Sequence, residues 1–293
     1  MHMVVAVQDH WIELGQYENL SKRLTQTIEI PDFTGRRDEI GHLSGNLREM
    51  TDALYSRIEA IESFAADVAH ELKNPLTSMR SAVETLPLAK SEASRARLLA
   101  VIEHDVKRLD RLISDISDAS RLDAELQRRE TGAVDLSQLL TTVVTIANQV
   151  RLDDGVTVSL KFEGSPRAFV VPGHDSRLGQ VVDNLIDNAR SFSPQGGNVR
   201  ITCRRLKQEV EITVDDDGPG VQSDALEKIF QRFYTDRPHQ GFGQNSGLGL
   251  SISKQIVEAH GGNIRVENRS SVAAAGQQPR VLGARFVVRL PAM

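Results

Sequence analysis

The sequence predicts a multidomain protein, in which an all-α coiled coil and helical hairpin precede an α/β sandwich domain. Three observations lead to this fold class. Apolar residues recur at alternating four- and three-residue spacing early in the chain, a second long amphipathic stretch follows a Leu-Pro-Leu break, and short alternating stretches mix with helical ones from about residue 130. A chain of 293 residues is long enough for about two domains.

Composition narrows the function classes. The chain is 40% hydrophobic and 26% charged, with a formal net charge of −5. A phosphate-binding surface is normally basic, so this mild negative charge argues against nucleic acid as the main partner. The single cysteine, Cys203, excludes an internal disulfide and fits a reducing compartment. No apolar run approaches the ~18–20 residues that a helix needs to span a bilayer.

The first part of the chain is expected to be helical. Residues 4–28 predict a weak helix, which a break around Pro31 ends. A long helix is expected from near Asp38 to about Thr85, where Leu86-Pro87-Leu88 stops it. Its apolar seam has the spacing of a coiled coil and consists of Leu43, Leu47, Met50, Leu54, Ile61, Phe64 and Val68.

The seam is interrupted once, at Arg57, where ordinary irregularity is a better interpretation than a switch point. A second helix is expected from about Ser91 to Asp123. Its apolar face consists of Leu98, Ile102, Val106, Leu109, Leu112, Ile113 and Ile116. Two long helices joined by a short turn form an antiparallel hairpin, which covers only part of its own apolar surface. A homodimer is therefore expected, in which two hairpins form a four-helix bundle.

The rest of the chain predicts a domain of mixed helix and strand. The expected strands are residues 156–162, 199–203, 210–214 and 286–290, and the expected helices are residues 136–150, 176–192 and 248–260. They predict one mixed sheet with helices on one face. Residues 270–278, rich in Ser, Ala, Gly and Gln, predict a flexible loop.

Two polar motifs in this domain suggest a ligand site. Asn184 and Asn188 lie four residues apart in an expected helix and so share a face, and a carboxamide oxygen suits Mg²⁺ that bridges phosphates. Asp216 follows an expected strand and could accept a hydrogen bond from an exocyclic amine, as in adenine. The neighbouring Gly218 and Gly220 let the backbone approach a ligand closely. Taken singly, a solvated asparagine and an ordinary acidic turn are the better interpretations.

Two further motifs follow in the chain. Residues 229–234, Ile-Phe-Gln-Arg-Phe-Tyr, are by themselves best interpreted as a helical core stripe. Residues 241–250 are rich in glycine and lead into an expected helix, whose N-terminal N–H groups would face phosphates. No Gly-Lys-Ser/Thr follows, so this is not a Walker loop, and the strand–turn–helix context of a dinucleotide-binding loop is missing.

The order and spacing of the four motifs resemble the N, G1, F and G2 boxes of one ATPase fold. Histidine kinases share this fold with type II topoisomerases, the ninety-kilodalton heat-shock chaperone and mismatch-repair ATPases, and the resemblance covers about residues 135–293. It implies that ATP and Mg²⁺ bind, that Asp216 contacts adenine, that Asn188 binds the metal and that residues 221–246 form a lid. The implied cleft residues are Asn184, Asn188, Asp216, Gly218, Gly220, Arg232, Gly247, Leu248 and Gly249.

One position in the resemblance separates phosphoryl transfer from ATP hydrolysis. Hydrolytic members of this fold tend to carry Glu where this chain has Asn184, and a Glu can act as a general base for water. Asn184 cannot take a proton, so ATP is expected to wait for another nucleophile. Ser191 stands where the family often has a lysine, which leaves Arg190 and Arg232 as candidates for contacting the phosphates.

The expected nucleophile is His70. Residues 64–76, Phe-Ala-Ala-Asp-Val-Ala-His-Glu-Leu-Lys-Asn-Pro-Leu, resemble the H box of the largest class of histidine kinases. A lone helical histidine is usually a surface residue, but this motif ahead of a nucleotide domain outweighs that interpretation. A neutral imidazole is a competent nucleophile, and Glu71 can accept its proton. Asn74, one turn away, could position a water against a partner's phosphoaspartate, and Pro75 loosens the helix there.

These resemblances imply a two-component sensor histidine kinase. It would autophosphorylate His70 with ATP, pass the phosphoryl group to an aspartate of a response-regulator receiver domain, and act as a phosphatase toward the phosphorylated regulator. The implied domains are a HAMP-like relay (1–57), a dimerisation and phosphotransfer hairpin (58–126) and a catalytic ATP-binding domain (130–293).

The segment from residue 30 to residue 88 resembles the ChvG-type envelope sensors more than generic kinases. This likeness implies the cytoplasmic portion of an inner-membrane sensor, attached to the membrane only through a sensor and transmembrane region ahead of residue 1.

Two other functions are compatible with parts of the sequence. An ATP-driven conformational machine of the chaperone or topoisomerase kind is disfavoured by Asn184 and by the motif around His70. A non-catalytic dimeric scaffold with a degenerate nucleotide fold is disfavoured by the intact Asn188, Asp216 and glycines. Autophosphorylation within one chain and between two chains both remain open.

Overall fold

The computed structural model describes residues 31–126, 132–149, 155–164, 169–234, 246–271 and 280–293. The chain divides into two compact units, Met1–Ala66 and Asp67–Met293. Three expectations lie wholly or largely outside the described residues: the helix at 4–28, the flexible loop at 270–278 and the central part of the lid.

Two long helices form the first part of the described chain, as the apolar spacing predicts. Helix α2 runs from Glu39 to Thr85, and the short 3₁₀ helix η1 (Leu86–Leu88) ends it. The carboxylate of Asp38 accepts a hydrogen bond from the N–H of Gly41 at 3.2 Å, which caps the start of α2. Helix α3 (Glu92–Leu126) begins in the same way, because Ser91 Oγ accepts the N–H of Ser94 at 3.2 Å.

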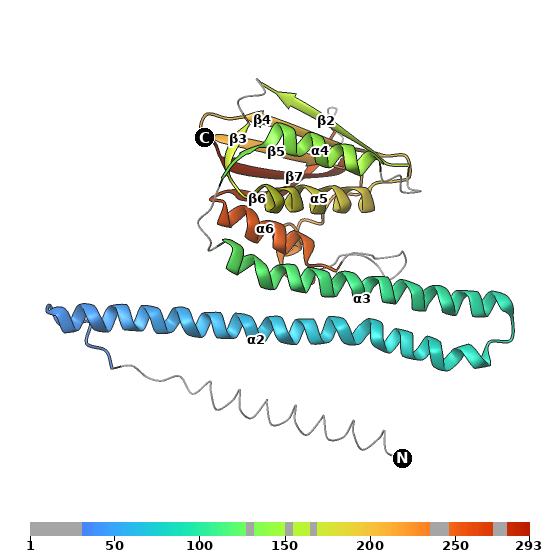
Figure 1. Ribbon diagram of the computed structural model, residues 1–293, viewed down its shortest axis with the longest axis horizontal. Helices are drawn as coiled ribbons and strands as arrows, with labels where there is room; N and C mark the ends of the chain where they lie inside the picture. Colours follow the sequence, from blue (N-terminus) through green and yellow to red (C-terminus); the bar gives the residue numbers. More distant parts are fainter. Residues whose placement is uncertain (1–30, 127–131, 150–154, 165–168, 235–245, 272–279) are drawn as a thin grey trace, which may run out of the picture. The chain divides into compact units, whose positions relative to one another are not determined.

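Apolar side chains along both helices stay exposed in the single chain. Leu43, Met50, Leu54 and Ile61 of α2 are each more than half exposed. In the second unit, α3 returns antiparallel to the end of α2 (Figure 1), so Ala82 and Leu112 are buried while Val83, Val106 and Ile113 remain more than half exposed. This is the half-covered apolar surface that the hairpin was expected to present. In the part of the chain that the structure describes, every helix is too short or too polar to cross a membrane.

Among the described residues of the second unit, a mixed sheet of five strands has the order β2-β4-β5-β7-β6. Its strands are β2 (Thr157–Glu163), β4 (Asn198–Arg205), β5 (Glu209–Asp215), β6 (Asn263–Ser270) and β7 (Val281–Pro291). Strands β2 and β4 are parallel, and the other pairs are antiparallel. A separate antiparallel ribbon joins β1 (Gly132–Asp135) to β3 (Val170–Gly173).

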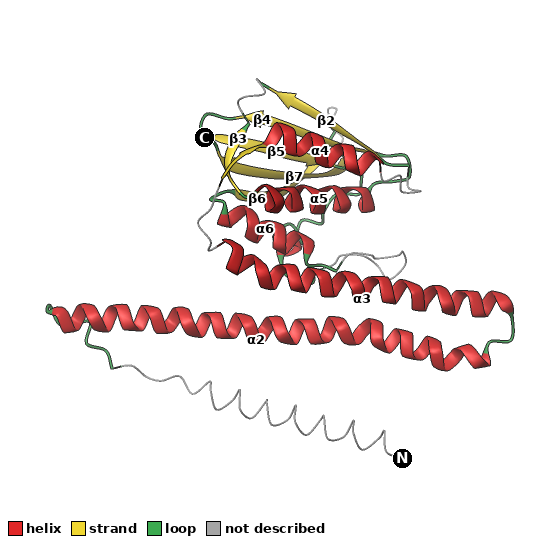
Figure 2. Cartoon of the chain, viewed as in Figure 1, coloured by secondary structure: helices red, strands yellow, loops and turns green. Residues whose placement is uncertain are grey.

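Three helices cover one face of the sheet, as Figure 2 shows: α4 (Leu136–Gln149), α5 (Asp175–Phe192) and α6 (Gly249–Ala259). Their apolar stripes are buried against the strands, and Leu140, Leu185 and Ile256 are almost fully buried. Cys203 of β4 is also buried, and burial raises the pKa of its thiol to about 12. The expected α/β sandwich is therefore present.

Two expectations about local structure need correction. Strands β1, β3 and β6 were not predicted, because each is short or rich in polar residues. The expected helical stripe at residues 229–234 is only the single 3₁₀ turn η3 (Lys228–Phe230). It cannot continue, because Phe233 has a φ of 58°, outside the right-handed helical region.

Candidate functional site

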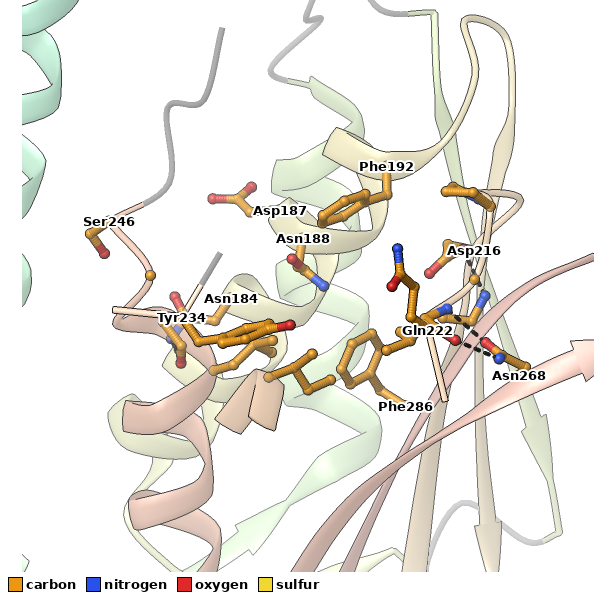
Figure 3. Close-up of a pocket in the computed structure, with 18 of the residues that line it drawn as sticks. Asn184, Asp187, Asn188, Phe192, Asp216, Gln222, Tyr234, Ser246, Asn268 and Phe286 are labelled. Carbon is orange, nitrogen blue, oxygen red and sulfur yellow. Dashed lines mark hydrogen bonds between the residues drawn. The ribbon is translucent and has the colours of Figure 1, made fainter. Parts of the chain in front are cut away.

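A cavity of about 650 Å³ opens between α5, α6 and the loop that follows β5. Six of the nine predicted cleft residues line it: Asn184, Asn188, Asp216, Gly220, Gly247 and Gly249. Figure 3 shows Asn184, Asn188 and Phe192 projecting from α5 toward the same space that Asp216 and Phe286 face from the sheet side. Motifs that lie up to 65 residues apart in the sequence, from Asn184 to Gly249, thus meet in one cavity.

Asp216 is buried, and its two oxygens have different surroundings. Oδ1 accepts the backbone N–H groups of Ala284 at 2.9 Å and of Gly218 at 2.8 Å. Oδ2 makes no hydrogen bond with another described residue. Burial raises the pKa of Asp216, and the two backbone N–H groups oppose that rise. The carboxylate is therefore held by one oxygen and offers the other to the cavity.

The carboxylates on either side of Asp216 are paired with arginines. Arg285 donates two hydrogen bonds of 2.7 Å to the carboxylate of Asp215, one to each oxygen. Arg200 donates to Asp217 at 2.6 Å, and this bond holds the pKa of Asp217 below its ordinary value. Arg269 lies within 3.4 Å of both Asp215 and Asp217 and donates to the backbone carbonyl of Asp216 at 2.7 Å. Of the three carboxylates, only that of Asp216 is left for a ligand.

These arginines were not found from the sequence, because they come from three different strands. The sheet register places Asp215 opposite both Arg200 of β4 and Arg285 of β7. The signal that could have revealed them is the acidic run itself, since three adjacent carboxylates need positive partners.

The two asparagines of α5 are used differently. Asn184 donates from Nδ2 to the Gly249 carbonyl at 3.1 Å and to Ser253 Oγ at 3.3 Å, which ties α5 to the first turn of α6. The carboxamide of half-buried Asn188 makes no hydrogen bond with another described residue and lines the cavity. Asn188 is therefore available to a ligand, while Asn184 shapes the cavity wall.

The chain enters α6 through a turn that requires glycine at position 247. Gly247 has a φ of 77°, and a Cβ there would lie 2.8 Å from the Cα of Phe233. The N–H of Phe233 donates to the Gly247 carbonyl at 3.0 Å. Ser246 donates to the carboxylate of Asp115 on α3, and burial raises the pKa of that carboxyl. Asp115 and Arg111 of α3 also line the cavity, and the sequence motifs did not indicate them.

Three predicted cleft residues do not line this cavity. Gly218 lines a separate cavity of about 440 Å³, Leu248 is only 1% exposed in the core, and Arg232 is exposed. Of the two candidate phosphate-binding arginines, Arg190 is buried and donates to the Val156 carbonyl at 3.1 Å. This placement argues against a phosphate contact for Arg190.

The donor set suits a metal that is shared with phosphates. Among the residues in the described ranges, no cluster of three or more His, Cys, Asp or Glu side chains could hold an ion. The carboxamide of Asn188, which makes no hydrogen bond with another described residue, lines the cavity instead. Mg²⁺ keeps several waters and is usually held by one or two protein oxygens together with substrate phosphates, so these residues fit it.

His70, Glu71 and Asn74 lie on α2, and none of them lines the cavity. His70 and Asn74 are exposed, and the expected kink site Pro75 is buried within the helix. Glu71 accepts a hydrogen bond from Arg108 of α3 at 2.9 Å. Arg108 stands 37 residues further along the chain, and only the antiparallel pairing of the hairpin brings it to Glu71.

Comparisons with known proteins agree with this arrangement. Residues 60–125 match the His Kinase A (phospho-acceptor) domain. Residues 173–293 match the histidine kinase-, DNA gyrase B-, and HSP90-like ATPase domain. The first match contains the exposed His70, and the second contains most of the residues that line the cavity.

Two relatives and one solved structure extend the comparison. The sensor protein ChvG of Rhizobium meliloti (strain 1021) is 59% identical over 271 residues, which are 90% of this chain and 46% of that protein. The histidine-protein kinase/phosphatase MprB of Mycolicibacterium paratuberculosis is 33% identical over 270 residues, 89% of this chain and 48% of that protein. The chain thus spans about half the length of these relatives.

The solved structure is that of the histidine kinase ThkA in complex with the response regulator protein TrrA. It aligns with a TM-score of 0.62 over 82% of this chain and 64% of that one, at 22% identity, which shows a common fold. The chain therefore belongs to the sensor histidine kinases, and it carries both their phospho-acceptor domain and their ATPase domain.

Proposed function

We propose that this chain moves the γ-phosphoryl group of ATP onto His70 and then onto an aspartate of a response-regulator receiver domain. One observation carries the proposal. An exposed histidine in a phospho-acceptor helix precedes a cavity in which a free carboxamide, Asn188, and a half-engaged carboxylate, Asp216, face the same space.

Adenine recognition is assigned to Asp216. The exocyclic amine of adenine donates hydrogen bonds, and Oδ2 of Asp216 is an acceptor with no competing donor among the described residues. The arginines on Asp215 and Asp217 remove neighbouring acceptors that would otherwise compete. The base would thus be read by a single fixed oxygen, which favours adenine over purines that carry an oxygen at the same position.

The phosphate end is assigned to Asn188 and to the start of α6. Gly247 and Gly249 bring backbone N–H groups of the α6 N-terminus to the cavity, where the helix dipole favours negative charge. Asn188 would ligate Mg²⁺. Mg²⁺, when bound, neutralises charge that develops on the phosphates during transfer. Arg232, which is exposed and belongs to the implied lid segment, is the candidate cation for the phosphates.

In the transfer step, one ring nitrogen of His70 attacks the γ-phosphorus. The bond from that phosphorus to the bridging oxygen breaks, and ADP leaves with its electron pair. Glu71 takes the proton of the other ring nitrogen. The hydrogen bond from Arg108 engages one oxygen of Glu71 and leaves the other oxygen for the proton.

Asn184 cannot activate a water molecule for hydrolysis of ATP. Its amide cannot accept a proton, and its N–H groups are already committed to Gly249 and Ser253. His70 does not line the cavity, so transfer requires the cavity of the same chain or of a partner to meet α2. A homodimer through the exposed stripes of α2 and α3 would supply both possibilities.

The same chain is also proposed to remove the phosphoryl group from the phosphorylated regulator. Asn74 is exposed one turn from His70 on α2, where a docked receiver domain would meet both. The relative MprB is named a kinase/phosphatase, which supports this part by likeness. Nucleic acid is not a proposed partner. A membrane-anchored sensor ahead of this segment, with the segment on the cytoplasmic side, stays a prediction from the resemblance.

The direct test uses ATP labelled at the γ-phosphate. The wild type should acquire acid-labile phosphate in the presence of Mg²⁺, and chelation of Mg²⁺ should abolish it. His70→Gln should bind ATP but remain unlabelled, whereas the control His42→Gln, another exposed histidine of α2, should label like the wild type. Labelling of His70→Gln would contradict the assignment of the nucleophile.

A further inference from the structure

The side chain of Asn268 on β6 closes a pair of hydrogen bonds with the backbone of Val221. The N–H of Val221 donates to Oδ1 at 2.7 Å, and Nδ2 donates to the Val221 carbonyl at 2.7 Å. Figure 3 draws this pair beside the cavity that Asn268 and Val221 both line. One carboxamide thus satisfies both polar backbone groups of a loop residue, as a neighbouring strand would.

The loop that Asn268 holds is a wall of the proposed adenine subsite. It runs from Asp216 to Val221 and passes through Gly220, which has a φ of 81°. A Cβ on Gly220 would lie 2.7 Å from Asn268 Oδ1, so the loop and the carboxamide are packed without spare room. The Asp216 end of the loop follows β5 directly, and the Val221 end is bound to the sheet by the Asn268 side chain.

The sheet register connects the two sides of the subsite. Asn268 of β6 stands opposite Ala284 of β7. Ala284 is the residue whose N–H donates to Asp216 Oδ1 at 2.9 Å. One rung of the β6–β7 ladder therefore holds the Val221 wall through a side chain and the Asp216 carboxylate through a backbone N–H. The separation between wall and carboxylate is set by that rung.

We propose that Asn268 is a positioning residue that sets the adenine specificity of the cleft. It touches no reacting atom. It fixes Val221 relative to Asp216, so that a base held against the wall presents its exocyclic group to Oδ2. This inference rests on the proposed ATP-binding function. Its competitor is a purely structural role, in which Asn268 stabilises the fold without affecting how the base is read.

The test measures binding of ADP and of inosine diphosphate, both with Mg²⁺, by calorimetry on the full chain. Inosine carries an oxygen where adenosine carries the exocyclic amine. Loss of two ordinary hydrogen bonds predicts that Asn268→Ala weakens ADP binding by roughly 5- to 30-fold. The preference for ADP over inosine diphosphate should fall by a similar factor, because a loosened wall no longer fixes the base. Affinity for inorganic triphosphate, which has no base, should not change.

Asn263→Ala is the matched control, since Asn263 is an exposed asparagine at the other end of β6. It should leave both nucleotide affinities unchanged. Asn268→Asp is a second variant in case the alanine variant does not fold. It keeps the oxygen that accepts the Val221 N–H and replaces only the donor to the Val221 carbonyl. It should also lose the preference for ADP over inosine diphosphate.

The outcomes separate the inference from the function beneath it. A wild type that binds no ADP would overturn both. A wild type that binds ADP, together with an Asn268→Ala variant that keeps its preference over inosine diphosphate, would overturn the positioning role alone. That result would mean that Asn268 only stabilises the fold, whatever the change in the unfolding temperature of the variant protein.

Discussion

Replacement of Asp216 by asparagine should do more than weaken ATP binding, because the structure fixes which way the new amide would face. Oδ1 of Asp216 accepts N–H groups from Ala284 and Gly218. In Asp216→Asn, only the amide oxygen can take that place, so the NH₂ group must occupy the position of Oδ2. A donor then faces the exocyclic amine of adenine, which is also a donor.

The magnitude follows from the bond that is lost. A hydrogen bond to a charged group contributes about 1.5–3 kcal/mol, so ADP affinity should fall roughly 10- to 150-fold. Inosine diphosphate should gain relative to ADP, because its oxygen accepts from the new NH₂ group. Calorimetry with both nucleotides gives the two affinities and their ratio.

The neighbouring carboxylate supplies the control. Asp217 is engaged by Arg200 and by the N–H of Asn198, so Asp217→Asn should change stability without exchanging base preference. If Asp216→Asn keeps the wild-type ratio of the two affinities, Asp216 does not read the base, and the adenine subsite has been placed at the wrong end of the cavity.

Three further predictions concern stability, phosphatase activity and assembly. His260 accepts the His174 N–H at Nε2 (3.0 Å) and contacts the Ile256 carbonyl through Nδ1 (2.7 Å), an arrangement that requires a neutral ring. Burial lowers the pKa of His260 below the ordinary 6.5, with His174 adding to the effect, so the unfolded state binds the extra proton more readily. The resulting stabilisation is complete above pH 6.5 and is lost as pH falls through the folded pKa. Melting temperatures from pH 8 to 5 should thus fall less steeply in His260→Gln than in the wild type, and parallel curves would contradict this. Asn74→Ala should retain labelling of His70 while slowing dephosphorylation of the regulator several-fold, because it removes only a water-positioning amide; equal time courses for both proteins would leave Asn74 a structural role beside Pro75. The full chain should scatter light as a dimer at micromolar concentration and a 130–293 fragment as an ATP-binding monomer, whereas a monomeric full chain would count against the exposed apolar stripes as an interface.

The helices were predictable from the sequence because their apolar periods are long. The apolar seam of α2 keeps its spacing from Leu43 to Val68, and the single interruption at Arg57 does not hide it. Strand β6 was missed for the opposite reason. Its first half alternates through Ile264 and Val266, but its second half contains Asn268 and Arg269, whose side chains hold the loop after β5. A strand that uses its side chains for a site no longer has the pattern of a strand.

Some residues of the candidate site were predictable from the sequence, and others were not. Asn188, Asp216 and the glycines belong to short local motifs, and the structure brings all of them except Gly218 to one cavity. Arg200, Arg269, Arg285 and Arg108 have no motif, since each meets its partner only through strand register or hairpin pairing. Sequence alone cannot supply these pairings because they depend on which residues stand opposite each other.

The bond from Asn184 to α6 limits how this fold could change its chemistry during evolution. A single substitution to Glu would add a general base for water, as in the hydrolytic members of the fold. It would also replace the donor that holds the Gly249 carbonyl with an acceptor, so two oxygens would face each other at the start of α6. A lineage that moved from transfer to hydrolysis would therefore need a second change to anchor that helix again. Two features therefore oppose ATP hydrolysis by this chain: position 184 lacks a general base, and placing one there would remove the hydrogen bond to the Gly249 carbonyl.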